Sequence, residues 1–273
     1  MPELPEVETL VRELRGALEG LRIQNVFVWN TAILKTPRRV LEKNLPGRSV
    51  REVNRVGKYI RVELSGDGVL WFHLGMTGQL FFEEPGVRAP AHTHFALSFE
   101  NFPQQLFYRD VRRFGKIALT SGEREARPRG VSRLGPEPGD WDPEAFASEL
   151  KARRARIKNL LLNQNLISGL GNIYADESLH RAGIHPLKRA HRISHEGLHR
   201  LHGAIREVLE EAVRWGGSSI DDYRHLDGSS GEFQKFHRVY GRKGEECPAC
   251  GGSIRKIQLS GRSASFCPQC QPS

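Results

Sequence analysis

The hydrophobic positions at the start of the chain recur at the spacing of an amphipathic helix. Val7, Leu10, Val11 and Leu14 fall on one face, because an α-helix turns once every 3.6 residues. Proline in the first turn costs no hydrogen bond, and glutamates there suit the positive end of the helix dipole. The pattern therefore predicts a helix over residues 2–19.

The first half of the chain beyond this helix is rich in β-forming segments. They are "RIQNVFVW" from Arg22, "KYIRVEL" from Lys58, "VLWFHL" from Val69, "HFALSF" from His94 and "KIALT" from Lys116. The turn "SGDG" at Ser65 to Gly68 is expected to join two of them as a hairpin. This half is therefore predicted to be mostly β.

The composition changes between Ser121 and Asp142, where glycine, proline and charged residues dominate. Such a stretch is typical of a linker, and 273 residues suffice for two domains with separate cores. We expect a first domain over residues 1–130 and a linker over residues 131–142.

The pattern after the linker is helical. Helical segments run "PEAFASELKARRARIKNLLLN" from Pro143 and "IYADESLHRAGI" from Ile173, and a further helix follows Ser194, a suitable N-cap. The apolar face of this last helix carries Leu198, Leu201, Ile205, Val208, Leu209 and Ala212. A helical domain is thus predicted over residues 143–240, and it includes a loop over 216–236 whose length is typical of functional or moving segments.

Charge adds a class of partner to this picture. Lysine and arginine number 41 against 32 acidic residues, which gives a formal net charge of +9. This excess favours a polyanionic partner, although a merely basic protein is the alternative. The chain has no run of 18 or more apolar residues, so no membrane span is predicted. Its acidic first residues also lack the basic-then-apolar order of a signal peptide. A cytoplasmic location is therefore expected.

The cysteines cluster at the end of the chain and predict one structural Zn²⁺. Two C-x₂-C pairs separated by sixteen residues have the spacing of a four-thiolate ribbon, and such a site has no open coordination position. A pair of thioredoxin-like redox motifs is the weaker alternative, because no βαβ pattern surrounds them. The ligands would be Cys247, Cys250, Cys267 and Cys270.

The zinc finger is expected over residues 241–273, with a short hairpin turning at Ser260-Gly261. The hairpin would present Arg255, Lys256 and Arg262, either as a nucleic-acid probe or as an ordinary solvated surface. A module of this size needs its metal to fold. Whatever it presents therefore depends on zinc.

The stretch "ISGLGNIYADE" predicts a tight turn followed by a helix. Gly169 and Gly171 allow the turn, and Asn172 is suited to cap the next helix. Free amides at a helix N-terminus bind phosphate oxygens, and Lys158 lies one helix earlier. An ordinary helix-turn-helix corner is the alternative interpretation.

Seven motifs in order resemble one family. They are "PELPEVET" at the start, "GK" at Gly57-Lys58, "HLGMTG" from His73, "RRFG" from Arg112, "GLGNIYADE" from Gly169, "VYGRKGEEC" from Val239 and the final ribbon. Together, and nearly end to end, they resemble bacterial formamidopyrimidine-DNA glycosylases, which repair oxidised purines. The related endonuclease VIII branch, with its preference for oxidised pyrimidines, usually has "PEGPE" where this chain has "PELPE".

The resemblance implies an α+β fold of two domains. The first is a β-sandwich with an N-terminal helix, and the second is a helix-two-turn-helix domain with a zinc-ribbon β-hairpin. It implies a monomer that acts on damaged double-stranded DNA in base-excision repair. The implied activity is that of a bifunctional glycosylase and AP lyase that removes 8-oxoguanine and formamidopyrimidines through a Schiff base, followed by β,δ-elimination.

The resemblance assigns the nucleophile to Pro2, exposed as a secondary amine once Met1 is removed. An α-amino group has a pKa of roughly 8 against about 10.4 for lysine, so a useful fraction is unprotonated at neutral pH. Glu3 is the implied proton shuttle, and Glu6 supports the same pocket. Glu8 is expected on the helix surface.

The resemblance also implies a wedge that fills the gap left by the extruded nucleotide. Its members are Met76, Arg112 and Phe114, although core packing is the alternative for the two apolar ones. The implied phosphate clamp is Lys58, Asn172 and Arg262, and Lys58 also counts among the catalytic residues. Further DNA-binding candidates with weaker support are His73, Lys158 and Tyr240.

Two departures from the family pattern limit this transfer. Val111 stands where many members have proline before "RRFG", and Asp221 stands where some carry lysine. The contacts that residues 216 to 236 make with the damaged base are therefore open. Two alternatives remain: the same chemistry on oxidised pyrimidines, and a catalytically silent protein that binds damaged DNA.

Overall fold

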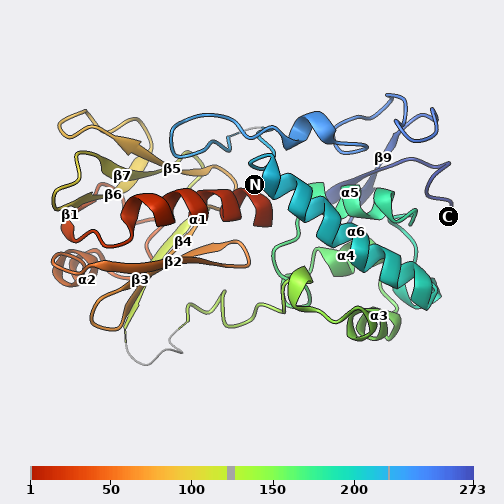
Figure 1. Ribbon diagram of the computed structural model, residues 1–273, viewed down its shortest axis with the longest axis horizontal. Helices are drawn as coiled ribbons and strands as arrows, with labels where there is room; N and C mark the ends of the chain where they lie inside the picture. Colours follow the sequence, from red (N-terminus) through yellow and green to blue (C-terminus); the bar gives the residue numbers. More distant parts are fainter. Residues whose placement is uncertain (1, 122–126, 221) are drawn as a thin grey trace. The chain divides into compact units, whose positions relative to one another are not determined.

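The computed structural model describes residues 2–121, 127–220 and 222–273 (Figure 1). The chain forms two compact units. Unit 1 comprises Met1–Ser132 and Trp215–Glu232, and unit 2 comprises Arg133–Arg214 and Phe233–Ser273. Asp221, where the sequence departs from the family pattern, lies outside the described residues, as do residues 122–126 in the stretch where the composition changes.

Unit 1 is built on two four-stranded antiparallel sheets, as the predicted β-sandwich requires. The first has the order β1-β6-β7-β5, with β1 (Ile23–Val28), β6 (Thr93–Phe99), β7 (Gln105–Asp110) and β5 (Gly78–Glu83). The second has the order β2-β3-β4-β8, with β2 (Val50–Val56), β3 (Tyr59–Leu64), β4 (Gly68–His73) and β8 (Lys116–Ser121).

The core of unit 1 lies between the two sheets. Phe72 of β4 meets Phe95 of β6 and Tyr108 of β7, with ring centroids 6.1 and 6.3 Å apart. Helix α1 (Leu4–Leu18) adds the apolar face predicted for it, with Leu10 and Leu14 each 1% exposed. The predicted hairpin at Ser65 to Gly68 is confirmed, because β3 and β4 are antiparallel neighbours.

Four elements of unit 1 were not predicted. Strands β5 and β7 lack a clean alternation of apolar and polar residues, because both of their faces are partly covered. Strand β2 carries several charged residues, and the short helix α2 (Arg38–Asn44) buries only Leu41. None of these segments has the periodicity on which a prediction from sequence depends.

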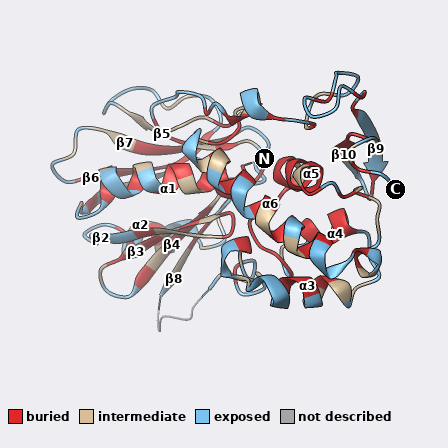
Figure 2. Cartoon of the chain, turned by 45° about the vertical axis from the view of Figure 1, so that its right-hand side comes forward, coloured by how far each residue is buried: buried red, intermediate tan, exposed pale blue. Residues whose placement is uncertain are grey.

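Unit 2 contains four α-helices and a two-stranded hairpin among its described residues. They are α3 (Pro143–Lys151), α4 (Ile157–Leu161), α5 (Asn172–Arg181), α6 (His195–Arg214), β9 (Arg255–Leu259) and β10 (Arg262–Phe266). Short 3₁₀ turns occur at Pro138–Asp140, Ala190–Arg192 and Phe233–Phe236. In Figure 2, α6 shows buried residues on one side and exposed residues on the other, as its sequence predicts.

The helical stretch predicted from Pro143 to Asn163 is two helices, not one. Between α3 and α4 the chain is extended, because its backbone pairs with a distant segment: Ala190 N donates to Ala155 O, and Ile157 N donates to Lys188 O. These bonds replace the intrahelical ones that a continuous helix would make. The predicted N-cap Ser194 is confirmed, since its Oγ accepts a bond from Gly197 N at 3.1 Å.

The sequence predicts that the loop over residues 216–236 belongs to the helical domain, and the structure differs there. Residues Trp215–Glu232 pack with unit 1. The reason is a set of hydrogen bonds to α1: Ser218 N donates to Glu6 and Leu226 N donates to Glu13.

Among the described residues, no helix is long and apolar enough to cross a lipid bilayer.

Candidate DNA-repair site

The start of α1 holds the predicted nucleophile and both predicted carboxylates in buried positions. Glu3 is the N-cap and forms a capping box with Glu6, in which Glu3 N donates to Glu6 Oε2 at 2.7 Å. Pro2 is buried immediately before them. The capping box satisfies backbone N–H groups at the start of α1 and so holds Glu3 and Glu6 in place.

Glu6 also joins this segment to the chain after α6. Its Oε1 accepts a hydrogen bond from Ser218 N at 2.7 Å. Gly217 has φ of 79°, and a Cβ there would lie 2.8 Å from Glu6 Oε1, so glycine is needed for both its conformation and the close approach. Glu6 therefore links the start of α1 to the segment that follows α6. Glu8, expected on the surface, pairs with Arg55 and Arg12.

Two neighbouring loops of unit 1 carry the predicted wedge. Met76 is 41% exposed and Phe114 is 50% exposed, so neither side chain belongs to the core. The Arg112 guanidinium lies over the Phe114 ring, 4.7 Å from its centroid. Gly75 lets the loops meet, because a Cβ there would lie 2.7 Å from the carbonyl carbon of Phe114.

A buried carboxylate that sequence analysis did not single out connects these loops. Asp110, which is 0% exposed, accepts hydrogen bonds from Thr77 Oγ1 at 2.5 Å and from Gly115 N at 2.7 Å. Arg112 N in turn donates to Thr77 Oγ1 at 3.1 Å. One side chain thus holds the backbone on both sides of the wedge. Val111, the departure from the family pattern, is 45% exposed beside it.

The candidates Lys58 and His73 also belong to unit 1. Lys58 follows Gly57 in the two-residue turn between β2 and β3, and it is 6% exposed. Burial lowers the pKa of His73 to about 4, with further lowering from Lys116 and Lys58. Its Nδ1 accepts a bond from Gly75 N at 3.1 Å, so at neutral pH His73 presents an uncharged N–H and not a cation.

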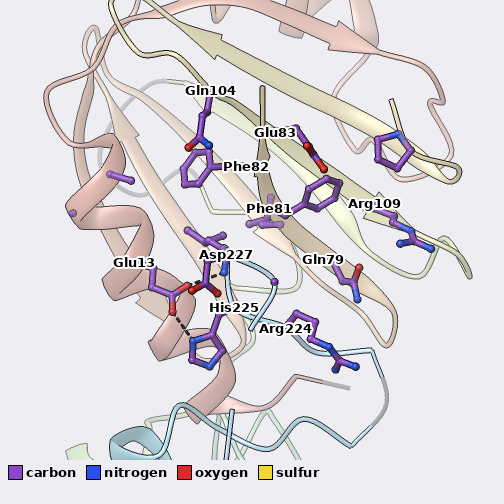
Figure 3. Close-up of a pocket in the computed structure, with 16 residues that line it drawn as sticks. Glu13, Gln79, Phe81, Phe82, Glu83, Gln104, Arg109, Arg224, His225 and Asp227 are labelled. Carbon is purple, nitrogen blue, oxygen red and sulfur yellow. Dashed lines mark hydrogen bonds and ion pairs between the residues drawn. The ribbon is translucent and has the colours of Figure 1, made fainter. Parts of the chain in front are cut away.

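A separate hollow of about 900 Å³ lies on unit 1, and Figure 3 shows its lining. Glu13 accepts bonds there from Leu226 N at 3.0 Å and from His225 Nδ1 at 2.8 Å. Its lining includes Arg224, His225 and Leu226 of the predicted loop over residues 216–236, but neither the predicted nucleophile nor the predicted wedge. The hydrogen bonds to Glu13 hold this part of the loop on α1.

Two of the candidates in unit 2 differ from their predicted settings. Asn172 does not cap α5: Gly171 is the N-cap, and Asn172 is the first helical residue. Its Nδ2 donates to Ser263 Oγ at 3.4 Å, while its buried Oδ1 has no hydrogen-bond partner among the described residues. Lys158 is 0% exposed, and its ammonium lies 2.5 Å from Asp176 Oδ1 and 2.6 Å from Ser263 O.

Lys158 therefore holds the hairpin through Ser263 O and through the carboxylate of Asp176. Asp176 completes the link, because its second oxygen accepts a bond from Ser265 N at 2.9 Å. Burial raises the pKa of Asp176 to about 7, and the nearby Lys158 ammonium opposes that rise. Arg262, at the tip of the hairpin, is exposed, as are Arg255 and Lys256.

Glu177, next to Asp176, joins two of the sequence motifs. Its carboxylate accepts hydrogen bonds from the backbone N–H groups of Arg238, Val239 and Tyr240, at 2.8–3.0 Å. The candidate Tyr240 is thus fixed through its backbone, and its ring packs edge-on against His237. The sequence offered no signal for this role, because acidic residues in a helix are mostly exposed.

The four cysteines fit a tetrahedral zinc site. The Sγ atoms of Cys247 and Cys270 lie 3.8 Å apart, and those of Cys250 and Cys267 lie 3.4 Å apart. A tetrahedron with Zn–S bonds of 2.3 Å has edges of roughly 3.8 Å, and all four sulfurs lie within 4.8 Å of one another. None of the four forms a disulfide. The predicted turn at Ser260-Gly261 is confirmed, with φ of 51° and 77°.

Comparison with known proteins accounts for nearly the whole chain. Residues 1–117 match the formamidopyrimidine-DNA glycosylase N-terminal domain, residues 134–224 its H2TH domain, and residues 244–272 the zinc finger found in FPG and IleRS. Formamidopyrimidine-DNA glycosylases of Solibacter usitatus and Heliobacterium modesticaldum are 47% and 43% identical to it, with at least 99% of each chain covered.

Solved structures give the same result. A variant of Lactococcus lactis FPG in complex with DNA that contains Fapy-dG has a TM-score of 0.93 at 38% identity, with full coverage of both chains. A MutM complex with DNA containing carbocyclic 8-oxo-G has a TM-score of 0.92, also at 38% identity and full coverage. The predicted fold class is confirmed, and the chain belongs to the formamidopyrimidine-DNA glycosylase family.

Proposed function

We propose that this protein is a base-excision-repair glycosylase and AP lyase that removes oxidised purines from duplex DNA. The observation that carries the proposal is the buried segment Pro2 to Glu6, in which a capping box and Ser218 N fix a proline and two carboxylates. Family membership over 99% of the chain supports the reaction class. Chromosomal DNA as the substrate favours the cytoplasm as its location.

Pro2, freed of Met1, acts as the nucleophile. Its nitrogen bonds to C1′ of the damaged nucleotide while the C1′–N bond to the base breaks, and the base leaves with a proton. Ring opening of the sugar gives an iminium that draws electrons from C2′, and loss of the C2′ proton expels the 3′ phosphate. Glu3 moves protons at the sugar and the leaving base.

Glu6 positions these groups without contacting the substrate. Because it holds both Glu3 N and Ser218 N, it couples the nucleophile to the segment proposed to contact the lesion. A misplacement of about 1 Å in such a segment costs on the order of 100-fold in rate. Glu6 therefore acts through geometry.

DNA contacts are proposed on each unit. Unit 1 supplies Lys58, His73 and the wedge of Met76, Arg112 and Phe114, and unit 2 supplies Asn172, Tyr240 and Arg262. Thr77 and Asp110 set the backbone of the wedge before DNA arrives, which lowers the ordering cost of binding. Zinc, bound by the four cysteines, supplies the fold of the hairpin that carries Arg262.

Borohydride trapping tests the nucleophile. On a duplex with 8-oxoguanine opposite cytosine we expect a covalent adduct, and mass spectrometry should locate it on Pro2. Blocking the N-terminal amine should abolish the adduct, while Pro2→Gly should reduce it only in part. Glu8→Gln is the matched control, because Glu8 sits on the same helix but pairs with Arg55 and Arg12; its adduct should be unchanged.

The same assay separates the alternatives. One Lactococcus lactis FPG structure holds DNA with an oxidised pyrimidine, so parallel duplexes with oxidised pyrimidines should be included. Faster trapping on these would replace the proposed substrate class. Tight binding without an adduct on any oxidised base would mean a catalytically silent protein. Binding of the intact protein should also weaken steeply with salt, because lysine and arginine displace counterions.

A further inference from the structure

Three side chains in unit 2, outside all the sites described above, have the geometry of a metal centre. Glu144 lies in the first turn of α3, and His195 and His199 lie one turn apart at the start of α6. Glu144 Oε1 is 3.4 Å from His195 Nδ1, and Glu144 Oε2 is 2.9 Å from His199 Nε2. The three ligand atoms all lie within 4.8 Å of one another.

The helical register explains why the two imidazoles converge. Residues at i and i+4 lie on the same face of a helix, one above the other. Helix α3 packs on this part of α6, where the Phe146 ring lies 5.1 Å from the His202 ring (Figure 2). This packing brings Glu144 opposite the histidine pair.

Both helix starts are fixed by their own caps. Asp142 accepts bonds from Glu144 N at 2.9 Å and Ala145 N at 3.0 Å, and Ser194 accepts one from Gly197 N. The backbone that carries all three ligands is therefore ordered without metal. Preorganised ligands lose little conformational entropy on binding, which favours affinity.

The donor set selects the class of cation. Metal bonds of 2.0–2.1 Å in a tetrahedral site place ligand atoms roughly 3.3 Å apart, and the two Glu144 oxygens lie 3.4 Å from His195 Nδ1 and 2.9 Å from His199 Nε2. Two imidazoles and a carboxylate suit zinc, copper and nickel, whereas calcium and magnesium prefer oxygen alone. The side chains are 41–63% exposed, so water can fill the remaining positions.

We propose that Glu144, His195 and His199 form a second metal site, distinct from the four cysteines, that binds a divalent late transition metal such as Zn²⁺ and clasps α3 to α6. The carboxylate offsets the repulsion between the cation and the positive end of α6. The site is open and lies outside the proposed catalytic residues. Its effect is therefore on metal binding and on the stability of unit 2.

Calorimetry with the zinc-loaded protein tests the site. Titration with Zn²⁺ should show a second equivalent, and Ni²⁺ and Cu²⁺ should bind with affinity rising in that order. Both His199→Ala and Glu144→Gln should weaken this second equivalent by on the order of tenfold to 100-fold. His92→Asn, at an exposed histidine of unit 1 with φ of 67°, should leave it unchanged, because asparagine tolerates that conformation.

Cobalt spectroscopy separates this site from the zinc finger. Co²⁺ added to the zinc-loaded protein should give visible bands without the sulfur charge-transfer absorption of thiolate ligands. The melting temperature should rise with added metal in the wild type but not in the double variant H195A/H199A. Absence of a second equivalent, or its persistence unchanged in the double variant, would overturn the proposal. Far-UV circular dichroism checks that each variant is folded.

Discussion

Asp110 in unit 1 and Asp176 in unit 2 are buried carboxylates that both hold backbone in place, but through different hydrogen-bond donors. Both side chains are 0% exposed, and each fixes backbone that carries proposed DNA contacts. Asp110 accepts from uncharged donors, a hydroxyl and a backbone N–H. Asp176 instead faces the ammonium of Lys158 and accepts one backbone N–H.

The difference shows what a buried ion pair adds. Removing two charges from water is costly, and their attraction repays this only when every remaining hydrogen bond is made. At Asp176 the pair does more than stabilise, because Lys158 also reaches Ser263 O of β10. It thereby sets the position of the hairpin on α4 and α5. At Asp110 neutral donors already fix both loops, so no second buried charge is needed.

The largest effect should follow from breaking the pair in unit 2 on one side. Lys158→Met leaves the Asp176 carboxylate buried without its cation, and the free energy of unfolding should fall by about 3–5 kcal/mol. Urea denaturation measures this. The double variant K158M/D176L should recover most of the loss, because no charge remains buried. A single variant within about 1 kcal/mol of wild type would show that the pair contributes little.

A smaller effect is expected from Asp110→Asn. The amide keeps one acceptor but turns an N–H₂ group toward a donor, which should cost about 1.5–3 kcal/mol in the free energy of unfolding and slow base excision by displacing the wedge. Asp67→Asn is the control: Asp67 has φ of 58° in the β3–β4 turn, where asparagine is accepted. Wild-type excision by D110N would contradict the role assigned to Asp110.

Lowering the pH should decrease the free energy of unfolding of each unit, because each contains a buried histidine. Burial lowers the pKa of His73 and of His237 to about 4, below the unfolded value of about 6.5. The unfolded state therefore binds more protons between pH 6.5 and 4, and the stability each group contributes above pH 6.5 is lost as the pH falls. From pH 7 to 5 the loss is about 2 kcal/mol per histidine.

Urea melts at pH 7 and pH 5 measure this loss for each unit. His73→Gln should remove the component of unit 1, and His237→Gln that of unit 2, so each variant should show a flatter dependence on pH than the wild type. An equally steep dependence in both variants would assign the acid sensitivity to other groups.

The smallest change in stability should come from the exposed wedge. Met76→Ala and Phe114→Ala remove side chains that are 41% and 50% exposed, so the free energy of unfolding should stay within about 0.5 kcal/mol of wild type. Single-turnover excision should nevertheless slow by on the order of tenfold or more, since the remaining wedge residues fill the gap in the duplex incompletely. Val87→Ala, at a residue 48% exposed, should change neither quantity.

The sequence by itself determined the features that depend on local pattern. The cysteine spacing gave the zinc ribbon, periodicity gave α1 and α6, and turn residues gave the hairpins at Ser65 to Gly68 and at Ser260-Gly261. The sequence alone leaves the roles of Met76 and Phe114 open, because an apolar residue is equally compatible with a core and with a wedge. The family motifs favour the wedge, and the exposure of both side chains shows that neither packs in the core.

Only the tertiary structure decided which polar residues turn inward. The bond from Ser218 N to Glu6 spans 212 residues, and the one from Ser265 N to Asp176 spans 89. Local periodicity in the sequence cannot indicate contacts between residues that are so far apart along the chain. Lys158 is a candidate for a phosphate contact because it lies one helix before the glycine turn, and the structure buries it because a carboxylate and a carbonyl from distant segments meet its ammonium. Whether a side chain is desolvated depends on the residues that pack around it in the folded protein, so burial cannot be predicted from the residue type alone.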